Sequence, residues 1–583
     1  MNGLKRTGNG AWLGLSLALA ACSSTPSTPS GATSGSAGSG SGAGGSATGA
    51  AGATGVAAAG AAGAAAAVPT ATCADGQSGK SAYRMLRRLS EGEYNSTLID
   101  TFGADAKSWQ NIQFVGDIRQ AGNYSTYSAA LSVNQPWMSA LVDSTFDRAQ
   151  ALLTGAQAAT LLVAPCSATA IDAACATAVV KNYGYRLFRR PVTDSEVADY
   201  VGLFTQGIST LQMTPVDALA GTLAALMQSP NALYIQELGQ AAGGGFKLSG
   251  YELASILAYG LTGTAPSKAL LDSAGTGALD TSAGIAAATQ ALITSLQGQA
   301  HMSTFFLQWL SYDGAPYAAK DPAVYTLPNP VATAMVTETQ QLVDKTYQSG
   351  GSLTDLLTSP NTYVNLSLAK FYGWPTDGLT DATFTLQQRP AGKGLGILAQ
   401  GGFLTRLGTP NSSSPTQRGL FVLRQLICGD IPPPPADVPV IPAPVANQTT
   451  RQRYEKQHAA AASCAGCHTH IDQIGFGLEN FDGIGAYRTM EAGQPIDSSG
   501  YIEDLNHTTF SGPEELARKL AAAPEVSQCL AAQMTAYVLG VSVGDGKCIA
   551  PAAAYAAGAT PLSLANVLTQ IMEPTHLQTR VAP

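Results

Sequence analysis

The sequence predicts a mainly α-helical protein made of several helical modules in series. Capping boxes, in which a Ser or Thr is followed three residues later by Glu, occur at Ser90–Glu93, Thr193–Glu196 and Ser249–Glu252. Apolar side chains then recur every three or four residues, for example over 94–102. This spacing places them on one face of a helix, which favours helices packed against one another.

The first 71 residues are expected to lie outside the folded part. Lys5 and Arg6 precede an apolar run at 11–20, and the sequence Leu-Ala-Ala-Cys ends at Cys22. This pattern is typical of a bacterial lipoprotein signal peptide over 1–21, with the Cys22 thiol carrying the lipid. The alternative is an ordinary secretory signal whose cleavage site happens to precede a cysteine. Residues 22–71 are nearly all small or Pro, which predicts a disordered tether.

These features predict a location in the cell envelope. No later run reaches the about 18 apolar residues that a membrane span needs, so we expect the lipid to be the membrane anchor. Ser23 and Ser24 follow the lipid-bearing cysteine, where an Asp would favour inner-membrane retention. We therefore expect an outer-membrane lipoprotein on the periplasmic or surface face. The net charge is -8 and no Lys/Arg cluster forms a stripe, so nucleic acid is not an expected partner.

Five modules are expected after the tether. They are an N-terminal helical module (72–160), a small helical module (161–206), a central helical module (207–385), a module with a proline-rich spacer (386–505) and a C-terminal helical module (506–583). Within them, apolar periodicity predicts helices over 137–153, 179–188, 216–227, 285–296, 304–310, 331–347, 364–372, 415–427, 454–462, 513–520, 526–539 and 564–572. Four consecutive prolines begin at Pro432, which predicts a stiff extended spacer up to Pro444.

The most specific chemical pattern is Cys464-Ala-Gly-Cys467-His468, in the fourth module. Two cysteines three apart, followed directly by histidine, form the attachment motif of c-type haem. The thiols can add to the two vinyl groups of one porphyrin, and the imidazole can bind the iron as proximal ligand. We therefore expect one covalent haem c. A structural or redox disulfide and half of a zinc site are the alternatives, although no second CxxC or paired His is present.

The second axial ligand of the iron would decide the kind of chemistry. Met490 is the first candidate and Met534 the second, although core packing explains Met534 equally well. His507 is a further candidate, whereas His470 is too near His468 in sequence to reach the other face of the porphyrin. A methionine ligand favours electron transfer with an unknown redox partner. An open position would permit a haem-dependent oxidoreductase reaction.

Several polar residues after the motif could act beside a haem. Glu479, Asp482 and Asp497 could transfer protons, but their Gly and Asn neighbours favour turn capping and backbone hydrogen bonds. Arg488 could pair with a haem propionate, and a solvated surface arginine is an equal alternative. No nucleophile elbow or HExxH pattern indicates a hydrolase. A helical scaffold or binding protein with a structural CxxC remains the second functional class.

Six cysteines remain after lipid and haem attachment, and an oxidising compartment favours three disulfides. The pairs nearest in sequence are Cys166–Cys175 and Cys529–Cys548. These two would leave Cys73 to pair with Cys428. Sequence alone does not fix the connectivity, so the third pair follows only from the first two.

Five stretches together resemble a known family: 88–97, 188–193, 248–255, 415–419 with the proline run, and 464–487. The chain is similar to the multi-module group of secreted, cytochrome-c-like proteins common in planctomycetes and myxobacteria. That group is built of domains of unknown function (the 1587, 1595, 1592, 1588 and 1585 set). The resemblance implies an extracytoplasmic, mostly helical, cytochrome-like protein without an established substrate. The chain departs from the family at Gln473, where proline is usual, and near Asn123, where aspartate is common.

Overall fold

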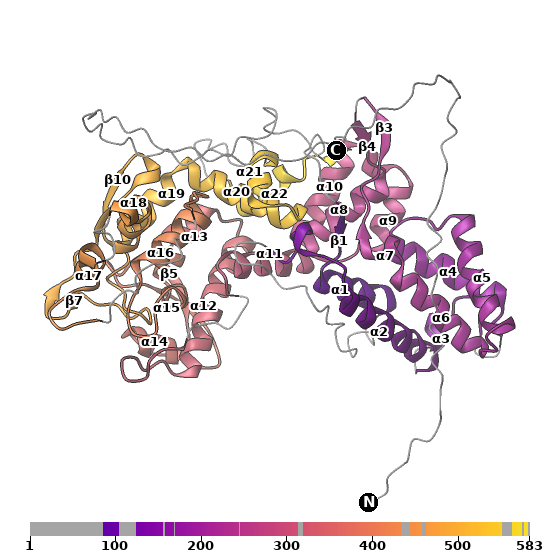
Figure 1. The fold of residues 1–583 in the computed structure, drawn as a ribbon, viewed down its shortest axis with the longest axis horizontal. Coiled ribbons are helices and arrows are strands. Elements are labelled where there is room, and N and C mark those ends of the chain that lie inside the picture. Colours follow the sequence, from indigo (N-terminus) through magenta and orange to yellow (C-terminus); the bar gives the residue numbers. More distant parts are fainter. Residues whose placement is uncertain are drawn as a thin grey trace, which may run out of the picture. The chain divides into compact units, whose positions relative to one another are not determined.

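The computed structural model describes residues 86–103, 124–155, 158–167, 170–243, 245–312, 319–432, 444–457, 462–550, 562–573 and 577–580 (Figure 1). All of them belong to one compact unit, Ala65–Pro583. The predicted signal peptide, Cys22, the tether, Cys73 and most of the proline run lie outside the described residues.

The described residues are mainly α-helical, as the sequence predicts. The α-helices are α1 (Glu91–Phe102), α2 (Gln135–Thr154), α3 (Ala158–Leu161), α4 (Ala173–Phe188), α5 (Asp194–Ser209), α6 (Pro215–Gln228), α7 (Pro230–Leu233), α8 (Gly250–Thr262), α9 (Lys268–Gly275), α10 (Ser282–Thr294), α11 (Leu296–Trp309), α12 (Asn329–Gln348), α13 (Leu353–Thr358), α14 (Leu366–Tyr372), α15 (Gly401–Arg406), α16 (Pro415–Phe421), α17 (Thr450–Gln457), α18 (Ala462–Phe476), α19 (Gly512–Ala522), α20 (Pro524–Leu539), α21 (Val543–Ile549) and α22 (Leu564–Ile571). A π-helical segment, η6 (Val422–Leu426), continues α16, and a 3-10 turn, η7 (Glu503–Leu505), follows β9.

Strands are short, and none of those described exceeds four residues. All of their pairings are antiparallel: β1 (Arg87–Arg88) with β2 (Tyr234–Ile235), β4 (Gly245–Lys247) with β3 (Gln240–Ala242) and β11 (Thr579–Arg580), β5 (Asn361–Val364) with β6 (Thr385–Gln388), β7 (Met490–Glu491) with β8 (Gln494–Pro495), and β9 (Ser499–Ile502) with β10 (Thr508–Ser511). The β1–β2 and β4–β11 pairs join segments that are far apart in the sequence.

The three predicted capping boxes are present. Ser90, Thr193 and Ser249 each accept a hydrogen bond from the backbone N–H of the Glu three residues later, and that Glu bonds back to the cap. Each box satisfies two backbone donors that a helix start would otherwise leave without partners. The helix starts are therefore determined locally, which explains why the sequence locates them.

One hydrophobic cluster extends from Leu89 to Leu577, so elements distant in sequence share a core. Helix α20, near the C-terminus, packs against α8, α11 and η6. A second, smaller cluster surrounds Trp374. These contacts of α20 join segments from different predicted modules. The module boundaries themselves stay predictions.

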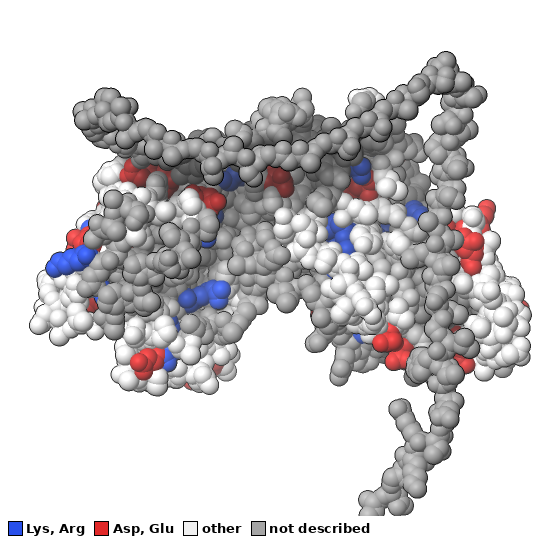
Figure 2. All heavy atoms as spheres, in the orientation of Figure 1, with Lys and Arg blue, Asp and Glu red and all other residues white. Residues whose placement is uncertain are grey.

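Charged residues are few, and part of the charge is buried. They make up 12% of the sequence. On the face drawn in Figure 2, Lys, Arg, Asp and Glu side chains form small, scattered groups among uncharged residues. Inside the fold, Arg87 pairs with Glu93 at 2.7 Å and Arg389 with Glu338 at 3.9 Å, with all four side chains at most 7% exposed. Some of the charged side chains therefore form ion pairs in the interior of the fold.

In the described part of the chain, no single helix combines the length and apolar character of a membrane span. The helix pair α20 and α21 passes the length and composition test together, but the two helices meet at 107°. Most residues of α20 are buried in the core.

The structure confirms one predicted disulfide and corrects the other two. Cys166 is bonded to Cys175, but Cys428 is bonded to Cys529. The predicted pairs Cys529–Cys548 and Cys73–Cys428 are therefore wrong; Cys548 is disulfide-bonded, but not to Cys529. The reason is tertiary packing. Cys428 follows η6, which lies against α20 and so brings Cys428 to Cys529 across 101 residues.

Candidate functional site

The CxxCH motif lies in the first turns of α18. Cys464 and Cys467 are both half-buried thiols, and they are not joined in a disulfide. Gly466, between them, is exposed, and a Cβ there would meet no atom within 4 Å. The start of α18 therefore presents two thiols and an imidazole, and there is open space beside the Cα of Gly466. This donor set fits a covalent haem c.

Two glycines fix α18 against α16. A Cβ on Gly419 of α16 would lie 1.7 Å from the Ile471 carbonyl oxygen, and one on Gly475 of α18 would lie 1.9 Å from that of Pro415. Any side chain at either position would overlap backbone, so the contact requires glycine. The close approach brings Thr416, on α16, into reach of α18.

A hydrogen-bonded chain starts at His468. Its Nδ1 lies 2.8 Å from Asp472 Oδ2, one turn further along α18, and Thr416 Oγ1 donates to Asp472 Oδ1 at 2.6 Å. The His468 and Asp472 side chains are 12% and 3% exposed. A neutral imidazole that donates from Nδ1 to a carboxylate turns Nε2 to a metal. The carboxylate thus selects the tautomer that haem ligation needs.

Our sequence analysis missed Asp472 and Thr416. His468 and Asp472 are four residues apart, a spacing that places both on one face of a helix, but the helix predicted for this region ended at residue 462. Thr416 comes from another helix, 56 residues away in sequence, and no local pattern relates it to Asp472. Its position depends on the glycine contact between α16 and α18.

Two further histidines among the described residues near the motif are bound to different carboxylates. His470 Nδ1 lies 2.9 Å from Asp504 Oδ2, in η7. His507 Nδ1 lies 2.7 Å from Glu503 Oε2, and its side chain is 57% exposed. These two pairs are separate from the chain of His468, Asp472 and Thr416.

The candidate distal methionines differ in accessibility. Met490, in β7, is 51% exposed, whereas Met534 is fully buried in the core within α20. Core packing, one of the two interpretations of Met534, accounts for its position. Met490 is the candidate whose sulfur a haem iron could approach without repacking of the core.

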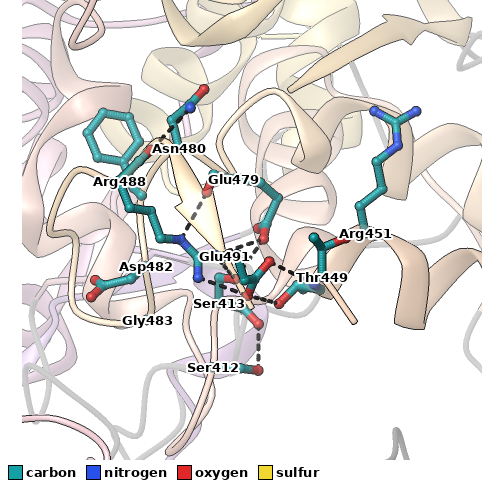
Figure 3. Close-up of polar contacts among 12 residues, drawn as sticks. Ser412, Ser413, Thr449, Arg451, Glu479, Asn480, Asp482, Gly483, Arg488 and Glu491 are labelled. Carbon is teal, nitrogen blue, oxygen red and sulfur yellow. Dashed lines mark hydrogen bonds and ion pairs between the residues drawn. The ribbon is translucent and has the colours of Figure 1, made fainter. Parts of the chain in front are cut away.

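The polar residues after the motif form a buried ionic network (Figure 3). Glu479 accepts from Ser413 Oγ at 2.7 Å and from Arg488 Nη2 at 3.3 Å, and it lies 3.5 Å from Arg418 Nη1. Burial raises the pKa of Glu479, and the neighbouring arginines oppose that rise. Arg488 also pairs with Glu491 at 2.8 Å. Glu479 and Arg488 are therefore bound to each other and to the fold.

The turn-capping interpretation holds for the two aspartates. Asp482 Oδ1 accepts from the backbone N–H groups of Ile484 and Ala486, each at 2.9 Å. Asp497 Oδ1 accepts from both the backbone and the hydroxyl of Ser499. Each carboxylate stabilises the turn that follows it.

The described residues give no support to the two alternatives for CxxCH. They contain no group of three or more His, Cys, Asp and Glu side chains that could hold a metal ion, so the zinc alternative gains no further ligand there. Cys464 and Cys467 are not joined in a disulfide in the structure, a state that a reduced redox pair shares, so the disulfide alternative stays open.

A cavity of about 370 Å³ lies elsewhere in the fold, between α1, α8, α11 and α20. Its walls include Asp100, His301, Thr304 and Tyr537. Burial lowers the pKa of His301 to about 4, so this imidazole is neutral at pH 7. The cavity contains none of the CxxCH residues and is separate from that motif.

Three family models match the chain in series. They are PSD5, a protein of unknown function (DUF1595), over residues 175–237; PSD4 (DUF1592) over 248–374; and PSCyt3 (DUF1588) over 394–491. The last contains CxxCH, Asp472 and the network around Glu479. No curated protein and no solved structure matches the chain. Three domains of the planctomycete, cytochrome-c-like set of domains of unknown function therefore follow one another in this chain.

Proposed function

We propose that this protein binds one covalent haem c through Cys464 and Cys467, with His468 as axial ligand, and acts in electron transfer. The observation that carries the proposal is the motif on α18 with His468 Nδ1 held by Asp472 at 2.8 Å. The cytochrome-like name of the matching PSCyt3 domain supports it. A bound haem supplies one-electron redox chemistry at its iron.

Different residues of the chain have different roles in holding the haem. The two thiols form thioether links, which fix the porphyrin to one turn of α18. Asp472 orients the His468 ring, and the glycine contact between α16 and α18 holds Thr416 against Asp472. Because α18 is anchored over its second half, the motif has a rigid support.

The first test is covalent attachment. The full chain, produced with cytochrome c maturation proteins, should keep its haem through denaturing electrophoresis and stain for haem-dependent peroxidase activity. Cys464→Ser with Cys467→Ser should lose this staining completely, because no thioether can form. The pyridine haemochrome spectrum measures the number of vinyl groups converted.

The matched control is Cys166→Ser with Cys175→Ser, which removes two cysteines outside the motif. This variant should retain haem in proportion to the folded protein. If the wild-type chain carries no covalent haem under these conditions, the proposal is wrong. The helical scaffold with a structural CxxC would then be the better interpretation.

We further propose Met490 as the second axial ligand, which favours an electron carrier over an oxidoreductase. The oxidised protein should show the weak long-wavelength band of a methionine–iron bond. Met490→Ala should abolish this band and yield a high-spin spectrum, whereas Met534→Leu should leave it in place. A wild-type haem that is already high-spin would contradict this assignment and favour oxidoreductase chemistry.

The proposed location is the outer membrane, with Cys22 as the lipid anchor. Its support is the Leu-Ala-Ala-Cys pattern after a basic N-terminus. Cys22→Ala should release the protein from the membrane fraction or leave its signal peptide uncleaved. Unchanged fractionation and processing would contradict the anchor.

A further inference from the structure

We infer that Asp472 is a positioning residue that makes His468 an electron-rich ligand and lowers the reduction potential of the haem. This inference rests on the proposed function. It concerns a carboxylate that lies outside the attachment motif.

The geometry gives Asp472 a direct effect on the ring. Its Oδ2 lies 2.8 Å from His468 Nδ1, the nitrogen opposite the metal-binding position. Thr416 Oγ1 donates to Oδ1 at 2.6 Å, and this second bond holds the carboxylate in one orientation. A carboxylate that accepts a hydrogen bond from the Nδ1–H group raises the basicity of the imidazole at Nε2.

The contrast with Glu479 shows why the charge of Asp472 acts on the ring. Both carboxylates are almost completely buried, and both lie in the segment that matches PSCyt3. Glu479 is paired with Arg418 and Arg488. In the described part of the chain, Asp472 forms no ion pair with an arginine or lysine; its partners are the His468 imidazole and the Thr416 hydroxyl. Its charge is therefore not cancelled by an arginine.

Burial preserves the effect of that charge. At 3% exposure, the Asp472 side chain lies in a low-dielectric environment, where water and salt screen it weakly. An electron-rich imidazole stabilises ferric over ferrous iron, because the oxidised form carries the extra positive charge. The centre should therefore hold its electron weakly and be a strong donor to its redox partner.

The test is a redox titration of the full chain with bound haem, followed by its visible spectrum. Asp472→Asn keeps the size of the side chain and removes the charge. Its amide oxygen can accept from His468 Nδ1, and its NH2 group can donate to Thr416 Oγ1, which reverses the direction of that hydrogen bond. At a fixed solution potential, it should raise the ratio of reduced to oxidised haem at least tenfold. A tenfold change corresponds to about 59 mV for one electron. Asp472→Glu, which keeps the charge, should restore most of the wild-type potential.

Asp504→Asn is the matched control, since it neutralises the carboxylate bound to His470 on the same helix. It should change the ratio less than threefold. Asp472→Ser removes the same charge and supplies the test if Asp472→Asn does not accumulate.

The outcomes separate this inference from the proposed function. A wild-type chain without covalent haem refutes the function. With haem bound in every variant, an unchanged potential in Asp472→Asn and Asp472→Ser refutes the role of Asp472. An equal shift in Asp504→Asn would also overturn it, because the effect would then be a general one of charge.

Discussion

Arg418→Met should destabilise the protein by about 3–5 kcal/mol, because it removes one partner of a buried ion pair. The Arg418 side chain is completely buried. Its guanidinium donates to the carbonyl oxygens of Leu478 and Phe481 at 2.8 Å and of Asp482 at 2.6 Å. Methionine has a similar length but no donors. These three carbonyls and that of Leu404 would lose a partner, and Glu479 would retain Arg488 alone among its arginines.

Chemical denaturation of the wild type and the variant measures this loss as a difference in free energy of unfolding. Arg424→Met is the matched control, because Arg424 lies six residues further along and is 44% exposed in its pair with Asp430. Removing a surface pair should cost less than about 1 kcal/mol. Equal losses in the two variants would show that the buried network adds no stability of its own.

The sequence predicted those parts of the structure that local chemistry determines. The helix starts at Ser90, Thr193 and Ser249 follow from hydrogen bonds within four residues, so each was readable without tertiary information. The Cys166–Cys175 disulfide also joins near neighbours. The CxxCH motif is local in the same sense, since its three side chains share one helical turn.

The parts that sequence analysis missed depend on contacts between distant segments. Thr416 reaches Asp472 only because Gly419 and Gly475 let α16 and α18 touch. Glu479 was a candidate for proton transfer in the sequence analysis. Its partner Arg418 lies on α16, 61 residues earlier, so no local pattern showed that the carboxylate is paired. The spacing of His468 and Asp472 is the exception, as helical periodicity could have related them. Tertiary packing, then, decides which polar residues support the site and which stabilise the fold.

The Cys428–Cys529 disulfide should make one of the largest single contributions to stability, because it closes a long segment. It spans 101 residues that include the whole CxxCH region. Closing a loop of this length restricts the unfolded chain by about 4–5 kcal/mol in the chain-entropy account. Cys428→Ala with Cys529→Ala should therefore lower the free energy of unfolding by this order, measured by denaturation without reductant.

Cys166→Ala with Cys175→Ala provides the comparison, since its loop has a sequence separation of 9. The same account gives about 2–3 kcal/mol for so short a loop. The longer disulfide also has native contacts beside it, where Gln533 Nε2 donates to Gln425 Oε1 at 3.2 Å and Lys547 Nζ to the Cys428 carbonyl at 2.5 Å. These contacts hold η6, α20 and α21 together without the covalent bond. The native fold should therefore persist in the Cys428→Ala, Cys529→Ala variant. Most of its lost free energy of unfolding should then come from the less restricted unfolded chain. An equal loss in both variants would contradict the loop-length explanation.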